Sequence, residues 1–188
     1  NNKLVRMIQM VPFNRNERIA AMLYILSDRP NYLFSYSYFC SIFSVKKPSI
    51  SGDISIMKKL VSKLDIGTIE TSSGVNGGVK FLPKMTDSLR MSMLEYLCSE
   101  LSDPSRIIPG GFIYILDILY SPNIVRNLGK IFAYEFRNKD VDYVVTIETK
   151  GIPIALMTAD MLNVPLVIIR KNTKITEGPT VNINYVSG

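Results

Sequence analysis

Three stretches with helical spacing of apolar residues open the sequence after residue 13. The first begins at Asn14, and Glu17 three positions later completes a capping box. We expect the inward face of this helix to contain Ile19, Leu23 and Leu26, with Ala20, Met22 and Ile25 beside them. The second covers residues 35–43, with apolar Phe39, Ile42 and Phe43. Residues 1–13 predict no particular element and fit a strand, an arm or a leader equally.

The third helical pattern covers residues 48–64, with Pro48 in the first helical position. Its apolar positions repeat at three- and four-residue spacing, which predicts one inward face. That face is expected to hold Ile50, Ile54, Met57, Leu60 and Val61. The residues left for the outer side are Ser49, Ser51, Asp53, Ser55 and Lys58.

A β-hairpin pattern follows the three helices. GTIET at residues 67–71 and GGVKFLP at 77–83 predict two strands joined by a glycine-rich turn. Three helices and a glycine-tipped hairpin, in this order, are typical of a winged helix-turn-helix. In that fold the N-terminal residues of the third helix read DNA in the major groove. The alternative is a small α+β domain with a solvated basic face.

The DNA-binding interpretation has definite candidate residues. Short donors flanked by cations suit contacts to phosphates and base edges. At the start of the third helix these candidates are Lys46, Lys47, Ser49 and Ser51. On the hairpin, Lys80 and Lys84 are expected to hold the DNA backbone.

The middle of the sequence predicts a connecting region. Thr86 caps a helix through about Ser102, and residues 102–111 form a loop rich in Pro and Gly. The stripe of that helix, expected to be core or a dimer contact, contains Met91, Leu94, Leu97, Cys98 and Leu101. Residues 112–119 are apolar, and residues 123–136 predict an amphipathic helix.

A βαβ pattern spans residues 141–171. Two runs rich in Val and Ile, 141–147 and 166–169, flank a helical pattern at about 153–162. Because neither run alternates with polar residues, we expect strands of a parallel sheet that are buried on both faces. Ligands of such sheets bind beyond the carboxyl ends of the strands.

Polar residues follow both runs and therefore share one predicted rim. Its cations are Lys150, Arg170, Lys171 and Lys174. Four cations, backbone amides and a helix N-terminus suit a phosphorylated ligand. In the alternative interpretation these are solvated strand ends, Gly151 only supplies a positive φ, and Glu148 pairs with Lys150. The tail, residues 176–188, predicts a strand or a flap over the rim.

Composition limits the possible chemistry. Residues 1–85 carry 12 Lys and Arg against 5 Asp and Glu, whereas residues 86–188 carry 10 against 11. A basic first part favours nucleic acid or an anionic surface as partner.

The absence of His excludes Ser-His and Cys-His catalysis and His-ligated metals. No apolar run reaches membrane-spanning length and no leader is indicated, so we expect a cytoplasmic protein in which Cys40 and Cys98 are buried reduced thiols.

Several strings occur together: SISGDI, GVNGGVKFLPKM, RIIPGGFIYILDI, TIETKGIPIA, NVPLVIIRK and KITEGPTVNINYVSG. On these strings the chain resembles the purine operon repressors of Gram-positive bacteria over about residues 14–188. That family joins a winged-helix domain to a type I phosphoribosyltransferase domain. The resemblance implies an α/β chain overall. It places an α+β winged helix-turn-helix at 14–85, and a phosphoribosyltransferase-like effector domain with a truncated parallel sheet at 86–188.

The resemblance also implies roles for the rim. TKGIP is similar to the pyrophosphate-binding loop of the family, which places Thr149, Lys150 and Gly151 on ligand phosphate. RKNTK is similar to the segment entering the flexible loop and contributes Arg170, Lys171 and Lys174. Phe112 occupies a place similar to that of a family aromatic whose ring could stack on a purine. In the alternative interpretation Phe112 is a core or hinge aromatic.

The implied function is a homodimeric repressor of purine biosynthesis genes that binds double-stranded DNA at an inverted-repeat operator. The implied effector is phosphoribosyl pyrophosphate (PRPP), which releases DNA. Purine or guanine nucleotides such as guanosine tetraphosphate compete with PRPP. No cofactor is required, Mg²⁺ is an optional companion of the effector, and no residue is expected to be catalytic.

The chain departs from the family because residues 1–188 contain no string of paired acids followed by a Gly-Gly-Thr-like loop, the PRPP-binding motif. We therefore expect a fragment or a shortened form with a half-built pocket. Two rivals remain. One is a purine phosphoribosyltransferase, although the carboxylates of the missing motif are absent and Glu148 is the one acid in the loop. The other is a DNA-binding protein whose second part only dimerises.

Overall fold

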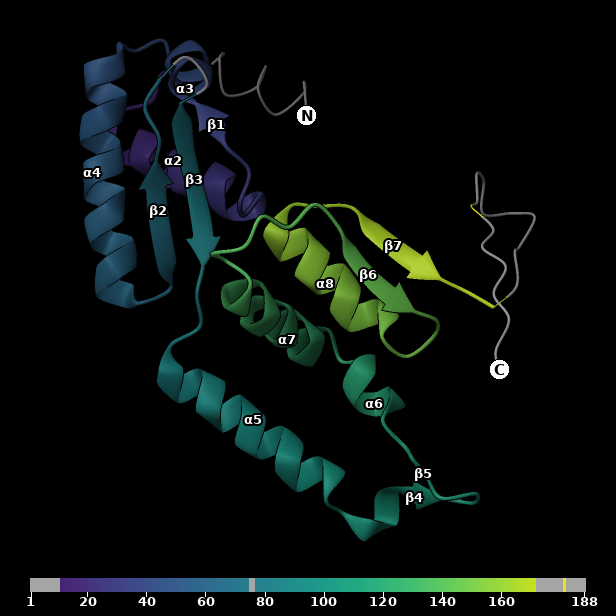
Figure 1. Cartoon of the computed structure of the whole chain (residues 1–188). Coiled ribbons are helices and arrows are strands. Elements are labelled where there is room, and N and C mark those ends of the chain that lie inside the picture. The colour runs from purple at the N-terminus through teal and green to yellow at the C-terminus, as the bar shows by residue number, and fades with distance from the viewer. Residues whose placement is uncertain (1–10, 75–76, 172–180, 182–188) are drawn as a thin grey trace.

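The computed structural model describes residues 11–74, 77–171 and 181. Figure 1 shows two groups of elements, with α5 extending away from both. The elements of the first group are α2 (Arg15–Asp28), β1 (Phe34–Ser35), α3 (Tyr36–Phe43), α4 (Lys47–Leu64), β2 (Gly67–Thr71) and β3 (Gly78–Pro83). The rest are α5 (Asp87–Leu101), η1 (Pro104–Arg106), β4 (Ile107–Ile108), β5 (Phe112–Ile113), α6 (Leu116–Leu119), α7 (Pro122–Glu135), β6 (Val144–Ile147), α8 (Ile152–Leu162) and β7 (Leu166–Ile169).

The first group has its own hydrophobic core. Three helices pack against an antiparallel sheet in the order β1-β3-β2, in which Gly67–Thr71 pairs with residues 79–83. The predicted capping box is present, because Asn14 accepts from the amide of Glu17 and the Glu17 carboxylate accepts from the amide of Asn14. The largest fully buried apolar side chains are Met22, Leu26, Phe39, Ile50, Met57, Val61 and Val79. This arrangement confirms the predicted winged helix-turn-helix.

The buried face of α2 is rotated slightly from the predicted one, toward the flanking positions Met22 and Ile25. Ile19 and Leu23 are only half-buried, whereas the buried stripe consists of Arg18, Met22, Ile25 and Leu26. The rotation has a polar cause, because Arg18 turns inward to pair with a carboxylate on α4. Leu60 of α4, also expected inside, is exposed.

The second group is a parallel pair of strands covered by helices. β6 and β7 pair from Val144 with Leu166 to Ile147 with Ile169, as the βαβ pattern predicted. The helix α8 covers one face and packs against α7 (Figure 1). The two helices approach so closely at Gly129 that a Cβ there would lie 2.6 Å from the Cβ of Met157.

Burial of both sheet faces was expected and is not observed. The outward residues are exposed, with Ile147 at 69%, and they comprise Val145, Ile147, Val167 and Ile169. The reason is structural, since within the described residues helices cover the α8 side alone. In the described part of the chain, these four side chains form an exposed apolar strip on the sheet face opposite α8.

The helix α5 buries none of its residues. Cys98 is therefore exposed, contrary to the expectation of a buried thiol, and Cys40 is half-buried. The prediction that the apolar stripe of α5 lies in a hydrophobic core is likewise wrong. Arg106 orders the segment that follows, because it bonds the carboxylates of Glu100 and Asp117 and the carbonyl oxygen of Tyr114. The predicted loop at 102–111 contains η1 and β4, and β4 pairs with β5.

Polar contacts join the two groups. The side-chain amide of Asn31, in the turn between α2 and β1, donates to the carbonyl oxygen of Met161 at 2.8 Å. A separate pair ties α5 to the second group, since Arg90 of α5 lies 3.8 Å from the carboxylate of Glu135 on α7. Among the described helices, none combines the length and apolar character that crossing a bilayer requires.

Candidate nucleic-acid interface and effector rim

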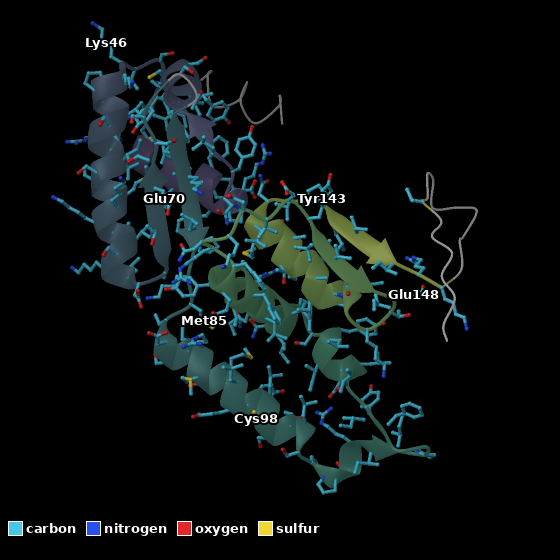
Figure 2. All side chains as sticks on the ribbon, viewed as in Figure 1. Lys46, Glu70, Met85, Cys98, Tyr143 and Glu148 are labelled. Atoms are coloured by element: carbon cyan, nitrogen blue, oxygen red, sulfur yellow. The ribbon has the colours of Figure 1, made fainter. Side chains whose placement is uncertain are left out.

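The N-terminal end of α4 forms an exposed polar surface. Lys46 is the N-cap residue, and its side chain makes no capping bond. Lys46, Lys47, Ser49 and Ser51 are all exposed, so the structure brings these four predicted residues together. Figure 2 shows Lys46 at one extremity of the molecule. The positive end of an 18-residue helix and two cations make this surface suitable for phosphate.

Neighbouring elements hold this surface in place. Ser44, in the left-handed region at φ 53°, ends α3 and turns the chain into α4. The ammonium group of Lys47 lies 5.2 Å from the ring centroid of Tyr36, the first residue of α3. A cation held over an aromatic face is attracted by the ring quadrupole. The helix-turn-helix geometry therefore orients Lys47 as well as the helix itself.

The two candidate lysines of the hairpin each pair with a nearby carboxylate. Lys80 lies opposite Glu70 in the middle of the hairpin and pairs with its carboxylate at 3.4 Å. It lines a cavity of about 640 Å³ between the two groups, together with Asn31 and residues 136–142. Lys84 bonds Asp65 at 2.9 Å, and this hydrogen bond raises the pKa of Lys84. The structure therefore does not bring Lys80 or Lys84 to the start of α4.

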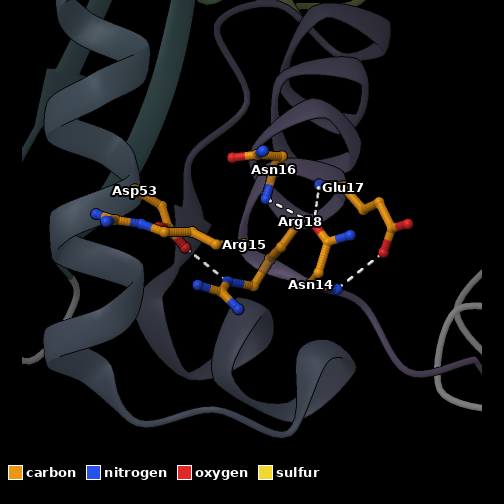
Figure 3. Close-up of polar contacts among 6 residues, drawn as sticks. All are labelled: Asn14, Arg15, Asn16, Glu17, Arg18 and Asp53. Carbon is orange, nitrogen blue, oxygen red and sulfur yellow. Dashed lines mark hydrogen bonds and ion pairs between the residues drawn. The ribbon is translucent and has the colours of Figure 1, made fainter.

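An ion-pair cluster beneath this surface was missed by sequence reasoning (Figure 3). Asp53, predicted to lie on the outer side of α4, is 1% exposed and accepts from Arg18 at 2.6 Å and from Arg15 at 3.2 Å. A signal did exist, because Asp53 follows Ile50 by three positions and precedes Met57 by four, which places it within the buried stripe. Its partners are 35 and 38 residues away in sequence, so pairing was not visible.

The second candidate site is the rim at the carboxyl ends of β6 and β7. Glu148 follows β6 and Arg170 follows β7, and their side chains pair at 3.0 Å. The amide of Lys171 also donates to Glu148, at 3.3 Å. The shared rim is therefore confirmed for these residues, while the partner proposed for Glu148, Lys150, is replaced by Arg170. The bond between Glu148 and Thr149 is a cis peptide.

The loop from Thr149 to Gly151 leads from this rim into α8. Thr149 and Lys150 are exposed, and Gly151 is the N-cap residue of α8. The positive-φ interpretation of Gly151 is wrong, because its φ is −74°. Glycine is instead required sterically, since a Cβ there would collide with Oγ1 of Thr146. Lys174 and most of the predicted flap lie outside the described residues.

Phe112 lies away from this rim. Its side chain is 65% exposed in the β4–β5 hairpin, directly after Gly110 and Gly111, which adopt φ of +94° and +76°. Figure 1 shows this hairpin beyond α5, apart from the carboxyl ends of β6 and β7. A core role for Phe112 is therefore excluded in this chain. Within residues 11–74, 77–171 and 181, no cluster of His, Cys, Asp or Glu is arranged to hold a metal ion.

The fold and both sites define a class of protein, namely a winged helix-turn-helix joined to part of a phosphoribosyltransferase-like sheet. Residues 14–83 match the family described as bacterial purine repressor, N-terminal. The resemblance of the chain to the purine operon repressor family is thereby confirmed, and it extends beyond these residues.

Two relatives match nearly the whole chain. The purine biosynthesis transcriptional repressor of Bacillus subtilis is 42% identical over 94% of the chain and 62% of its own length. The purine biosynthesis transcriptional activator of Lactococcus lactis is 42% identical over 93% of the chain and 64% of its own length. The chain thus spans just under two thirds of these relatives. The xanthine phosphoribosyltransferase of Streptococcus mitis is 43% identical over 54 residues, which are 29% of the chain and 33% of the enzyme.

Proposed function

We propose that the chain binds double-stranded DNA and represses purine biosynthesis genes. The observation that carries this proposal is the exposed group of Lys46, Lys47, Ser49 and Ser51 at the positive end of α4, the helix that reads DNA in a winged helix-turn-helix. The relatives named as purine biosynthesis regulators support it. A homodimer on an inverted repeat is the corresponding assembly, since two-fold symmetric operators match two-fold symmetric proteins.

The rim at β6 and β7 is proposed to bind a phosphorylated effector. The contacts proposed for its phosphates come from Thr149, Lys150, Gly151 and Lys171, while Arg170 is held by Glu148 at the same edge. Lys174 is proposed as a further cation, whereas Phe112 lies in the β4–β5 hairpin apart from this rim. The effector is PRPP, with or without Mg²⁺, and guanine nucleotides such as guanosine tetraphosphate compete for the site. PRPP shifts the DNA equilibrium because it binds the DNA-free state more tightly.

Fluorescence anisotropy tests DNA binding. A labelled inverted-repeat duplex from upstream of purine biosynthesis genes is compared with a scrambled duplex over a salt series. Each phosphate contact contributes a slope of about −0.9 to the plot of log K against log salt. The double variant Lys46→Gln/Lys47→Gln is expected to reduce the steepness by about 1.8, which is two contacts. The control Lys59→Gln/Lys63→Gln, from exposed positions later in α4, is expected to leave it unchanged.

The effector proposal is tested in the same assay. PRPP is expected to weaken binding of the wild-type chain to the inverted repeat, and Lys150→Gln is expected to reduce that response without changing DNA affinity in its absence. A wild-type chain whose DNA affinity ignores PRPP would contradict the effector proposal alone. A reporter fused to a purine promoter tests the sign of regulation, since one relative is named an activator.

The alternative of a purine phosphoribosyltransferase rests on the short similarity to xanthine phosphoribosyltransferases. The named regulators match over more than three times as much of the chain, and we propose that the chain is not an enzyme. Pyrophosphate release from PRPP in the presence of xanthine, guanine or hypoxanthine measures this directly. No release above a protein-free control is expected. Release above that control would contradict the proposal and support the phosphoribosyltransferase alternative.

A further inference from the structure

The carboxylate of Asp53 lies between two guanidinium groups. Arg18, whose side chain is 10% exposed, donates its Nε–H to Oδ2 at 2.6 Å and balances the carboxylate within the fold. Arg15 donates its Nε–H to Oδ1 at 3.2 Å, although its side chain is 61% exposed. Two cations share one anion, so the cluster presents an excess positive charge, and the exposed member is Arg15.

Arg15 lies across the first turns of α4. Its Nη2 is 3.6 Å from the position that a Cβ on Gly52 would occupy, so the guanidinium group covers the helix surface there. Gly52 follows Ser49 by three positions, which places both on one side of the helix, one turn apart. Figure 3 shows Arg15 reaching across the α4 ribbon beside Asp53. Arg15 therefore extends the polar surface at the start of α4 from a second helix.

The contact with Asp53 leaves the end of the guanidinium group available. The bond uses the Nε–H, so Asp53 engages none of the four Nη hydrogens, and a guanidinium group can donate two parallel N–H bonds to phosphate oxygens. Among the described residues, Asp53 is the one acceptor that Arg15 engages. A side chain already held in one orientation loses less freedom when it binds.

We propose that Arg15 binds a DNA phosphate beside the start of α4, and that Asp53 is the positioning residue that orients it. This inference rests on the proposed DNA-binding function and adds a contact from α2 that the helix-turn-helix pattern does not provide. Asp53 is buried, so its effect on the phosphate contact passes through Arg15, while its pair with Arg18 stabilises the fold.

The variant Arg15→Gln tests the contact, with Lys63→Gln as the control. Arg15→Gln is expected to weaken duplex binding and to reduce the steepness of the salt dependence by about 0.9, one phosphate contact. Lys63→Gln, an exposed cation in the last turn of α4, is expected to change neither. If the wild-type chain binds no duplex, the proposed function fails. If it binds and Arg15→Gln matches it in affinity and slope, this inference fails alone.

A double-mutant cycle tests the positioning role. Asp53→Asn is expected to weaken binding in the wild-type background and to cause no further loss in the Arg15→Gln background. An equal loss in both backgrounds would show that Asp53 serves the fold only. Circular dichroism reports whether Asp53→Asn folds. If it does not, Arg15→Lys decides, because lysine keeps the charge but lacks the Nε–H: retained slope with reduced affinity supports orientation by Asp53, and wild-type affinity overturns it.

Discussion

Replacing Asp53 with alanine removes the carboxylate that two ion pairs share. Comparing this variant with Arg15→Ala distinguishes what each pair contributes to stability. The variant leaves Arg18 with a side chain 10% exposed and no carboxylate at 2.6 Å, so a nearly buried charge loses its partner. Breaking a buried pair from one side costs about 3–5 kcal/mol. Arg15→Ala removes a pair whose cation is 61% exposed, and exposed pairs contribute at most about 1 kcal/mol.

Urea unfolding followed by circular dichroism measures both variants on the same chain. The expected order is a large loss of unfolding free energy for Asp53→Ala and a small one for Arg15→Ala, with similar m-values. Equal losses would refute the assignment of Arg18 as the structural partner and of Arg15 as the available one. A loss below about 1 kcal/mol for Asp53→Ala would show that the carboxylate is not held in a desolvated pair.

Three further predictions concern other parts of the chain. Asn14→Ala removes the N-cap of α2 and is expected to lower the urea midpoint by an amount equivalent to about 1 kcal/mol; an unchanged midpoint would contradict it. Gly129→Ala forces a Cβ against Met157 and is expected to destabilise by about 1–3 kcal/mol, whereas a gain from helix propensity would contradict the close packing. The pKa of Asp117 is lowered, mainly by its bond from Arg106, so its contribution is present above the unfolded pKa and is lost as pH falls through the folded one. Asp117→Asn should therefore lower thermal stability at neutral pH and match the wild type in strong acid, and a difference that persists there would contradict the assignment.

Much of the fold was accessible from local patterns. The capping box at Asn14, the hairpin from Gly67 to Pro83 and the parallel pairing of β6 with β7 each depend on residues close together in sequence or on a fixed strand period. The four candidate residues at the start of α4 followed from the position of Pro48, which marks the first turn. Such signals are physical consequences of helix ends and strand alternation.

The errors arose where contacts between distant segments decide the outcome. Asp53 turns inward because cations from α2 meet it, and this pairing also rotates the buried face of that helix. The apolar runs of β6 and β7 predicted two covered faces, but composition does not specify whether a second layer is present.

Hydrogen exchange of the whole chain, with and without the inverted-repeat duplex, shows directly which backbone segments the duplex covers. We expect the duplex to protect backbone amides in the first turns of α4, from Lys47 to Asp53, and at the N-terminal end of α2 near Arg15. We expect no change in α5. Protection confined to α5 or to the β6–β7 strands, with the first turns of α4 unaffected, would contradict the proposed interface.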